Sequence, residues 1–199
     1  MSVAVINYHG AMSRWPSNPR GRLAQAAMDL FVERGYDQTT VAEIAERAGL
    51  TERTFFRHFS DKREVLFQGG ELMQAAMVEA LAAAPAAATP MGAVRAAVAA
   101  VSPFFDERHE SSRLRQRIID AHPDLQEREV AKMARISRAL TEGLHERGVT
   151  DPDARLAADA GIAVFRSAFA LWLRSESGDM AKAMEQCFVA LEKLVERGR

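Results

Sequence analysis

The stretch from Glu52 to Phe59, ERTFFRHF, carries four side chains that can donate hydrogen bonds, and two of them are cationic. Phe55 and Phe59 stand four residues apart, which is the spacing of side chains on one face of a helix. A helix that buries this pair places the four donors mostly on its other sides; they are Arg53, Thr54, Arg57 and His58.

A second short helix and a tight turn are predicted just before this stretch. Thr40 and Glu43 form a capping box, in which the hydroxyl accepts a free backbone N–H and the carboxylate reaches back, so a helix starts at Val41. Gly49 favours the left-handed conformation that ends a helix, and Thr51 is expected to cap the next one. Two short helices joined in this way, the second with Arg and Thr outward, predict a helix-turn-helix that reads the major groove of DNA.

From about Arg20 to Leu66 the chain resembles the tetracycline-repressor-like (TetR) family of transcriptional regulators. The resemblance is carried by Gly35-Tyr36, Thr39-Thr40-Val41, Glu43-Ile44-Ala45, Ala48-Gly49, Thr54-Phe55-Phe56, His58-Phe59 and Asp61-Lys62. This combination is far more specific than a bare helix-turn-helix. Beyond Leu66 the resemblance is only architectural, because such proteins diverge in their carboxy-terminal, effector-binding part.

Position by position, the resemblance implies roles for the residues of the helix-turn-helix. Arg53 and Arg57 are expected to contact bases, since a guanidinium can bind O6 and N7 of guanine with two hydrogen bonds. Phe56 is a departure, because many relatives carry a tyrosine there whose hydroxyl can reach a phosphate. Contacts to the DNA backbone, which set register and affinity but not sequence, are expected from Thr40, Thr54, Phe56, His58 and Lys62.

The composition indicates an all-α protein. The chain has 199 residues, nearly half of them hydrophobic and only 7% aromatic, with long alanine-rich segments. Its net charge of −1 does not by itself indicate a nucleic-acid binder. Residues 47–63, however, hold five Lys or Arg against two acidic residues, and DNA affinity depends on where such cations lie relative to phosphates.

The lone Cys187 excludes an intramolecular disulfide and any cysteine-rich zinc site, and it fits the reducing cytoplasm, where we expect the protein to act. No run of about 18 apolar residues is free of charge, so no membrane span is expected. The first 20 residues lack the basic start and long apolar centre of a signal peptide.

Helical periodicity and capping signals predict about nine helices in three parts. These are a disordered arm (1–19), a three-helix DNA-binding domain (20–66) and an effector-binding and dimerisation domain (67–199). The fourth helix is expected to run from Lys62 to about Ala84 and to join the two domains, with a possible bend at Gly69-Gly70. The later helices are expected from Pro90, over 111–121, from Pro123 to before Gly148, over 152–175 and over 179–197.

The resemblance implies that the carboxy-terminal helices enclose a pocket for a small ligand. Binding of this ligand is expected to change the spacing of the two DNA-binding domains of a dimer. The expected lining residues are Phe104, Phe105, Arg117, Ile118, His122, Met133, Phe165, Phe169 and Trp172. Their mixture favours a largely hydrophobic ligand with an acidic or carbonyl end. Ordinary core packing is the alternative for each aromatic residue, and an exposed charge is the alternative for Arg117.

The last two predicted helices are apolar on more than one side. Their own domain can bury one of these sides, so the other needs a further packing partner. A two-fold four-helix interface with a second copy is the simplest cover and is what the resemblance implies. Its expected residues are Ala168, Leu171, Met184, Phe188, Leu191 and Val195. The expected function is a homodimeric repressor that binds an inverted repeat in double-stranded DNA and is released by a ligand. A larger core within one chain is the alternative to the dimer.

Two other classes of protein stay open. A DNA-binding architectural protein without an effector would show weak sequence preference and no response to ligands. A helical di-metal enzyme is considered because Glu142-x-x-His145 and Asp106-x-x-His109 have a spacing used in carboxylate-bridged metal sites. Glu142 falls on the wet side of its predicted helix, and Asp106 falls near a helix break, so neither a metal nor a cofactor is expected. No catalytic triad, Walker loop or dinucleotide-binding motif is present.

Overall fold

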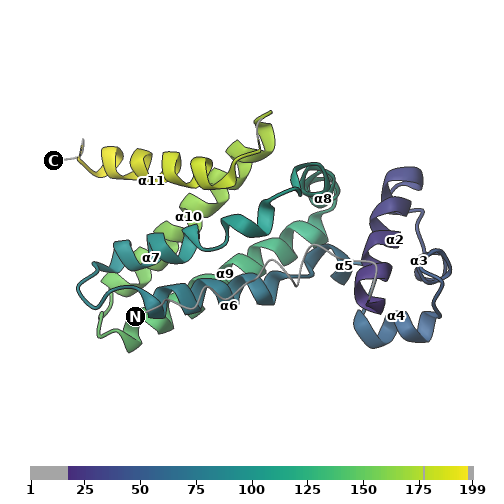
Figure 1. Cartoon of the computed structure of the whole chain (residues 1–199), viewed down its shortest axis with the longest axis horizontal. Helices are drawn as coiled ribbons and strands as arrows, with labels where there is room; N and C mark the ends of the chain where they lie inside the picture. Colours follow the sequence, from purple (N-terminus) through teal and green to yellow (C-terminus); the bar gives the residue numbers. More distant parts are fainter. Residues whose placement is uncertain (1–17, 177, 197–199) are drawn as a thin grey trace. The chain divides into compact units, whose positions relative to one another are not determined.

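The computed structural model describes residues 18–176 and 178–196. Every regular element in these residues is a helix, as the composition predicts, and the chain divides into two compact units between Gln68 and Gly69 (Figure 1). The predicted arm lies outside the described residues up to position 17. Its last two residues are structured, because Asn18 caps the first described helix and Pro19 begins it.

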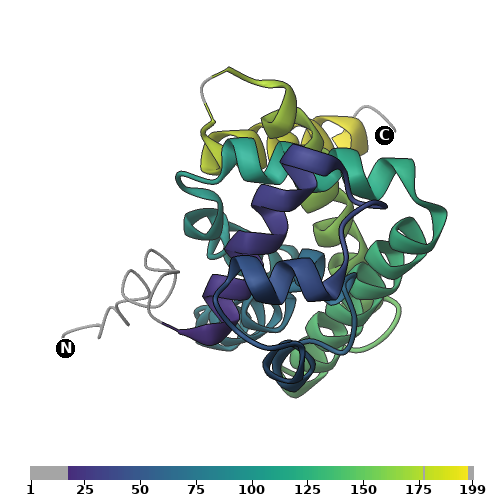
Figure 2. The same ribbon diagram turned by 90° about the vertical axis from the view of Figure 1, so that its right-hand side faces the viewer.

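The first unit is built on three helices, α2 (Pro19–Arg34), α3 (Val41–Arg47) and α4 (Glu52–His58), followed by the short α5 (Glu64–Phe67). The helix α2 packs on both α3 and α4, and these two pack on each other (Figure 2). The hydrophobic side chains with no more than 1% exposure that fill this unit are Leu23, Ala24, Ala27, Leu30, Ile44, Phe55, Phe59 and Val65. Helix α2 thus supports the helix pair that the sequence predicts as the DNA reader.

The predicted continuous helix from Lys62 to Ala84 is wrong. Helix α5 ends at Phe67, Gln68 has an extended ψ of 146°, and Gly69 has a φ of +82° before α6 (Gly70–Ala83) begins. A left-handed φ of this kind is accessible to glycine at little cost, since glycine has no Cβ. The glycine pair therefore separates two helices instead of bending one.

The second unit is a layered bundle around one long helix. It contains α6, α7 (Pro90–Ala99), the 3₁₀ helix η1 (Ser102–Phe105), α8 (His109–Ala121), α9 (Pro123–Glu146), α10 (Asp153–Arg174) and α11 (Met180–Glu196). Helix α10 packs against α7, α9 and α11, while α6 packs against α7 and α9. Phe104 and Phe105 lie in η1 and not in a continuation of α7.

Three predicted helix starts differ from the structure, and the first is that of α8, which begins at His109 and not at position 111. Pro152 is the N-cap of α10 and not its first residue, and the carboxylate of Asp151 instead accepts a hydrogen bond from His145 at 3.2 Å. Helix α11 begins at Met180, and Asp179 caps it by accepting the backbone N–H of Lys182 at 2.9 Å. Arg197, where this helix was predicted to end, lies outside the described residues.

By length and composition α10 is apolar enough to cross a membrane, although no membrane-spanning helix is predicted from the sequence. Its packing accounts for this apolar character, because it is the central helix of the second unit. Ala154, Ala158 and Ala168 are fully buried in it, and Trp172 is 1% exposed. Only 44% of its most apolar stretch is buried within the unit, however, so apolar residues also lie on its outer side.

Helices α10 and α7 approach each other closely at Gly161. A Cβ atom built on this glycine would lie 2.2 Å from Cγ1 of Val94, far inside van der Waals contact. Val94 is fully buried, so it has little space into which to move. The missing side chain at position 161 is therefore what allows the two helices to pack.

We predict that Gly161→Ala lowers the free energy of unfolding by about 1–3 kcal/mol, because overpacking outweighs the gain in helix propensity. Urea denaturation followed by circular dichroism measures this change. In the double variant with Val94→Ala the combined loss should be smaller than the sum of the two single losses, since the clashing methyl groups are gone. A Gly161→Ala variant more stable than the wild type would contradict the close packing.

Candidate nucleic-acid interface

Helix α4 has one buried side and one open side. Phe55 and Phe59 are 0% and 1% exposed, and their ring centroids lie 5.4 Å apart in the core of the first unit. Arg53 and Arg57 are exposed on the other side, and within the described residues neither forms a hydrogen bond or an ion pair. The structure therefore leaves both guanidinium groups available to an external partner.

The turn between α3 and α4 is set by local hydrogen bonds. Gly49 has a φ of +64°, and its N–H donates to the carbonyl of Glu46 at 2.9 Å. The next N–H, that of Leu50, donates to Ala45 at 2.8 Å. Thr51 then caps α4 by accepting the N–H of Thr54 at 3.2 Å, as predicted. These contacts define the direction in which α4 leaves the turn.

The predicted capping box at the start of α3 is confirmed. The hydroxyl oxygen of Thr40 accepts the N–H of Glu43 at 3.2 Å, and the carboxylate of Glu43 accepts the N–H of Thr40 at 2.8 Å. The hydroxyl of Thr40 also donates to this carboxylate at 2.9 Å, and Arg34 forms an ion pair with it at 2.6 Å. Both donors of Thr40 are thus in use, so contact with DNA would require one of them to change partner.

The other residues expected at the DNA backbone differ in availability. Phe56 is 56% exposed, whereas Thr54 is half-buried and its hydroxyl lies 3.0 Å from that of Thr51. The Nε2 atom of His58 is buried without a hydrogen-bond partner, so only Nδ1 could reach a phosphate with the ring in this orientation. These contacts stay predictions.

Lys62 is turned toward its own unit. Its ammonium donates to the carbonyls of Tyr36 at 2.6 Å and Thr39 at 2.9 Å, and it lies 4.2 Å from the centroid of the Tyr36 ring. Burial lowers the pKa of this ammonium. Lys62 therefore secures the loop between α2 and α3, and a contact with phosphate has to come from the remaining N–H or from a change of rotamer.

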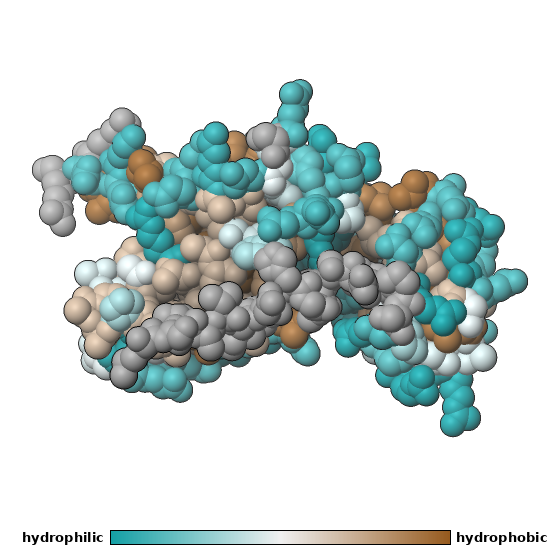
Figure 3. Space-filling model, viewed as in Figure 1, coloured by the Kyte–Doolittle hydropathy of each residue, from teal (hydrophilic) through white to brown (hydrophobic). Residues whose placement is uncertain are grey.

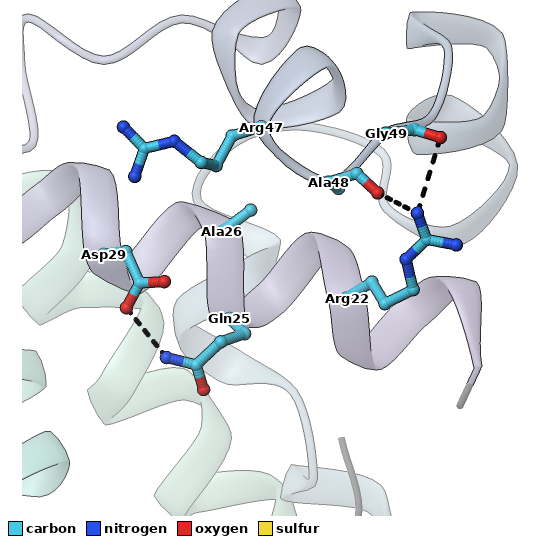
Figure 4. Close-up of a pocket in the computed structure, with 7 residues that line it drawn as sticks. All are labelled: Arg22, Gln25, Ala26, Asp29, Arg47, Ala48 and Gly49. Carbon is cyan, nitrogen blue, oxygen red and sulfur yellow. Dashed lines mark hydrogen bonds between the residues drawn. The ribbon is translucent and has the colours of Figure 1, made fainter. Parts of the chain in front are cut away.

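Two arginines of this unit form specific contacts that were not predicted from the sequence. Arg22 donates to the carbonyls of Ala48 and Gly49 in the turn, and Arg47 binds the carboxylate of Glu33 with two hydrogen bonds of 2.8 and 2.7 Å. Both lie beside a surface hollow between α2 and α3 (Figure 4). Its lining residues are Arg22, Gln25, Ala26, Asp29, Arg47, Ala48 and Gly49. No local sequence signal identifies Arg22, because its partners lie 26 and 27 residues away.

Four of the residues predicted to line an effector pocket form an aromatic cluster in the second unit. The ring of Phe105 lies 5.5–5.9 Å from those of Phe165, Phe169 and Trp172. Trp172 is 1% exposed, and its Nε1 has no hydrogen-bond partner. The ring of His109, which the sequence suggested for a metal motif and not for this cluster, packs edge-on against Trp172 at 4.8 Å, and its Nε2 lies 2.9 Å from the carbonyl oxygen of Trp172.

The remaining predicted pocket residues are placed differently. Phe104 and Met133 pack in or against the main core of the second unit, and Ile118 is buried in α8. Arg117 is exposed on α8, and Nδ1 of His122 lies 2.6 Å from the carbonyl oxygen of Ile118 at the junction with α9. The structure does not bring Arg117 and His122 into the aromatic cluster.

The predicted dimer residues also divide into two groups. Ala168, Met184 and Phe188 are 0–2% exposed within the second unit, so they have almost no surface to contribute to an outer interface. Leu191 is partly buried against the same core. Leu171 and Val195 are 43% and 59% exposed and remain candidates for contact with a second copy.

A partly buried ionic cluster between α8 and α9 was not predicted. One carboxylate oxygen of Glu129 binds Arg115 at 2.6 Å, and the other binds Lys132 at 2.7 Å. Burial, with repulsion by Arg115, lowers the pKa of Lys132 to about 8 despite the attraction of Glu129. The cluster joins the two helices through charged side chains.

The two histidines of the suspected metal motifs have other partners. His145 is hydrogen-bonded to Asp151, and His109 packs on Trp172. Across residues 18–176 and 178–196 no three His, Cys, Asp or Glu side chains lie together as a metal ion would need.

Comparison with known protein families gives matches to both units. The family described as "Bacterial regulatory proteins, tetR family" matches residues 23–68, and the "MftR C-terminal domain" family matches residues 88–196. The first match contains α3, the turn and α4. The second covers more than half of the chain.

Individual relatives agree with these matches. The chain is 38% identical to the HTH-type transcriptional regulator TcmR of Streptomyces glaucescens over 95 residues. This aligned stretch covers 48% of this chain but only 42% of TcmR. It is 25% identical to the regulator MftR of Mycobacterium tuberculosis over 91% of this chain and 93% of MftR. Among solved structures, the TetR family regulator PfmR of Thermus thermophilus is 26% identical and has a TM-score of 0.50, covering 86% of this chain and 97% of PfmR.

The hydrogen bonds of the capping box predict a pH dependence of stability. The backbone N–H and then the hydroxyl of Thr40, with Arg34 nearby, hold the pKa of Glu43 below its ordinary value of 4.5. The charged carboxylate therefore stabilises the fold above this pH, and the contribution is lost as the pH falls through the lowered pKa of the folded state. Glu43→Gln removes the charge.

We expect the difference in unfolding free energy between the wild type and Glu43→Gln to shrink as the pH is lowered from about 6 to about 3. Urea denaturation at a series of pH values measures this difference. Glu46→Gln is the matched control, because the side chain of Glu46 forms no hydrogen bond or ion pair in the described part of the chain. A difference for Glu43→Gln that stays constant with pH would contradict the assigned role of the carboxylate.

Proposed function

The chain belongs to the tetR family of bacterial regulatory proteins, and we propose that it is a repressor that binds a palindromic operator as a homodimer and is released by a small ligand. Family membership makes it a DNA-binding transcriptional regulator. Repression, the dimer and the ligand are the parts that belong to the proposal.

The observation that carries the proposal is the open side of α4. Arg53 and Arg57 stand about one helical turn apart, while Phe55 and Phe59 hold the opposite side of the helix in the core. Two unpaired guanidinium groups on one fixed helix can bind the edges of different base pairs in the major groove. A base-reading role explains why these cations have no partner within their own unit.

The outer side of α10 supports the homodimer. Among its exposed and half-exposed residues, a strip of small or apolar side chains recurs at helical spacing: Leu156, Ala160, Ala163, Ser167, Ala170 and Leu171. Small residues allow a second helix to approach closely. On the neighbouring α11, Leu194 and Val195 are 66% and 59% exposed, and Figure 3 shows apolar side chains in brown among the charged ones of this helix. A second copy would cover both helices.

The aromatic cluster supports a ligand in the second unit. A buried N–H without a partner costs about 1–3 kcal/mol, and a carbonyl or carboxylate oxygen beside Nε1 of Trp172 would recover this energy. The rings of Phe105 and Phe169, which pack on Trp172, and that of Phe165, which packs on both of them, favour a hydrophobic body for the same ligand. Such a ligand releases DNA only if it binds better to the conformation that does not bind DNA.

Solved structures of this fold include ligand complexes: SmeT with triclosan, and FadR of Thermus thermophilus with lauroyl-CoA. These two proteins are 22% and 23% identical to this chain. They provide first compounds for a ligand screen and not an assignment of the effector.

Selection of bound duplexes from a randomised DNA pool tests the proposal. About 150 mM salt is appropriate, because non-specific phosphate binding dominates at low salt. An inverted repeat is the expected product, and the selected duplex then serves as the probe for compounds that release it. Recovery of no motif, with and without ligand pools, would contradict operator recognition and favour an architectural DNA-binding protein.

We predict that Arg57→Ala weakens binding to the selected duplex by about 1–3 kcal/mol and relaxes the preference at particular base pairs, because a guanidinium contact to a base edge is lost. Binding titrations with duplexes substituted at single positions measure both effects. Arg138→Ala, which removes an exposed arginine from α9, is the control for charge alone. An equal loss on every duplex would reassign Arg57 to the DNA backbone.

We predict a dimer at micromolar concentration for the wild type and a folded monomer for Ala163→Glu, because the variant places a charge in the middle of the apolar strip of α10. Sedimentation velocity with circular dichroism measures both properties. Val130→Glu is the control, since Val130 is a 59% exposed apolar residue on α9. A monomeric wild type, or an Ala163→Glu variant that remains a dimer, would contradict this interface.

A further inference from the structure

Arg22 connects the first turn of α2 to the turn that precedes α4. Its Nη2 donates to the carbonyl of Ala48 and, at 3.5 Å, to that of Gly49 (Figure 4). These carbonyls follow the last residue of α3, where the helix dipole is negative and carbonyl groups lack intrahelical partners. A guanidinium is well suited to this position, because one charged group can satisfy two oxygens.

The absence of a side chain at Gly49 makes room for this contact. A Cβ atom on Gly49 would lie 2.9 Å from Nη2 of Arg22. The glycine therefore meets two requirements at once, the left-handed φ of +64° and the close approach of a guanidinium from another helix. The second requirement cannot be inferred from the spacing of the helix-turn-helix.

The first turn of α2 also contacts the other end of α4. The guanidinium of Arg20 lies 5.2 Å from the centroid of the Phe59 ring, and Phe59 is the C-cap of α4. Arg22 acts at the turn before α4, two residues ahead of its N-cap Thr51. Two arginines from one turn of α2 therefore make contacts near the two ends of the seven-residue α4.

The other ionic contacts between α2 and α3 do not include the turn. Arg34 binds Glu43 in the first turn of α3, and Arg47 reaches back to Glu33. Within the described residues, Arg22 is thus the side chain of α2 that is hydrogen-bonded to the backbone of the turn. Gln25, one turn further along α2, instead donates a hydrogen bond from its Nε2 to Oδ1 of Asp29 at 2.8 Å.

We propose that Arg22 is a positioning residue for base recognition. By holding the carbonyls of Ala48 and Gly49, it fixes the angle at which α4 leaves the turn, so that Arg53 and Arg57 reach the base edges in one register. Arg22 itself touches no base in this role. The inference extends the proposed operator recognition and rests on it for its DNA-binding consequence, but the contact with the turn is independent of DNA.

The test compares Arg22→Ala, Arg22→Lys and the control Gln25→Ala in the full-length protein. Binding is measured to the duplex selected by the wild type and to a scrambled duplex, over a range of salt, at a temperature where all variants are folded. For Arg22→Ala we expect about tenfold weaker binding to the selected duplex, the lower end of what a hydrogen bond with a charged group contributes. Binding to the scrambled duplex and the salt slope should not change.

Arg22→Lys should recover part of the specificity, because its ammonium keeps a cationic donor near the turn, and Gln25→Ala should behave like the wild type. A uniform loss on both duplexes with a salt slope reduced by about one would overturn the proposal, since it would make Arg22 a phosphate contact. An unchanged ratio of selected to scrambled binding would also overturn it.

Hydrogen exchange without DNA separates this inference from the proposed function. The N–H of Leu50, which donates to Ala45 across the turn, should exchange faster in Arg22→Ala than in the wild type or Gln25→Ala. Unchanged exchange of this amide would refute the contact with the turn whatever the protein does on DNA. Failure of the wild type to select any motif would refute operator recognition, while the exchange experiment would still decide the role of Arg22 in the turn.

Discussion

The burial of Phe55 and Phe59 is the interaction on which the proposed DNA-reading surface depends. A helix of seven residues is too short to be stable by itself, so α4 exists because its apolar side is held in the core. Each buried phenylalanine contributes about 1.5–3 kcal/mol. Once this pair faces inward, Arg53 and Arg57 must face outward, because they lie two residues from Phe55 on either side. The contact that stabilises the helix thus also determines which side of it is open to a partner.

Helix α10 has a similar double role in the second unit. Its inner side carries Phe165 and Trp172 into the core, and its outer side carries Ala163 and Leu171 toward solvent. In the proposed function, this helix would connect the proposed ligand site in the aromatic cluster with the proposed interface between two copies. The proposed coupling of a ligand to DNA release requires that a change of packing around Trp172 reach that interface, and α10 is the element that contains residues of both.

The sequence predicted features that depend on neighbouring residues, such as the capping box of Thr40 and the glycine turn at position 49. These signals are local, because each involves groups within about four residues. The reading side of α4 was also predictable, since two phenylalanines define its buried face. By contrast, Lys62 and Arg22 bind backbone groups more than 20 residues away, and Ala168 belongs to the inner side of a helix whose two sides are both apolar. Composition alone cannot distinguish the inner side of such a helix from its outer side.

Methylation interference on the selected duplex tests most directly the claim that α4 reads bases in the major groove. Methylation of guanine N7 blocks the atom that a guanidinium binds there. The account predicts interference at guanines in two symmetric half-sites about 34–36 Å apart, or a multiple of that distance, and its loss at particular guanines in Arg57→Ala. Interference from modified phosphates alone, with no effect of guanine methylation, would contradict base recognition by α4.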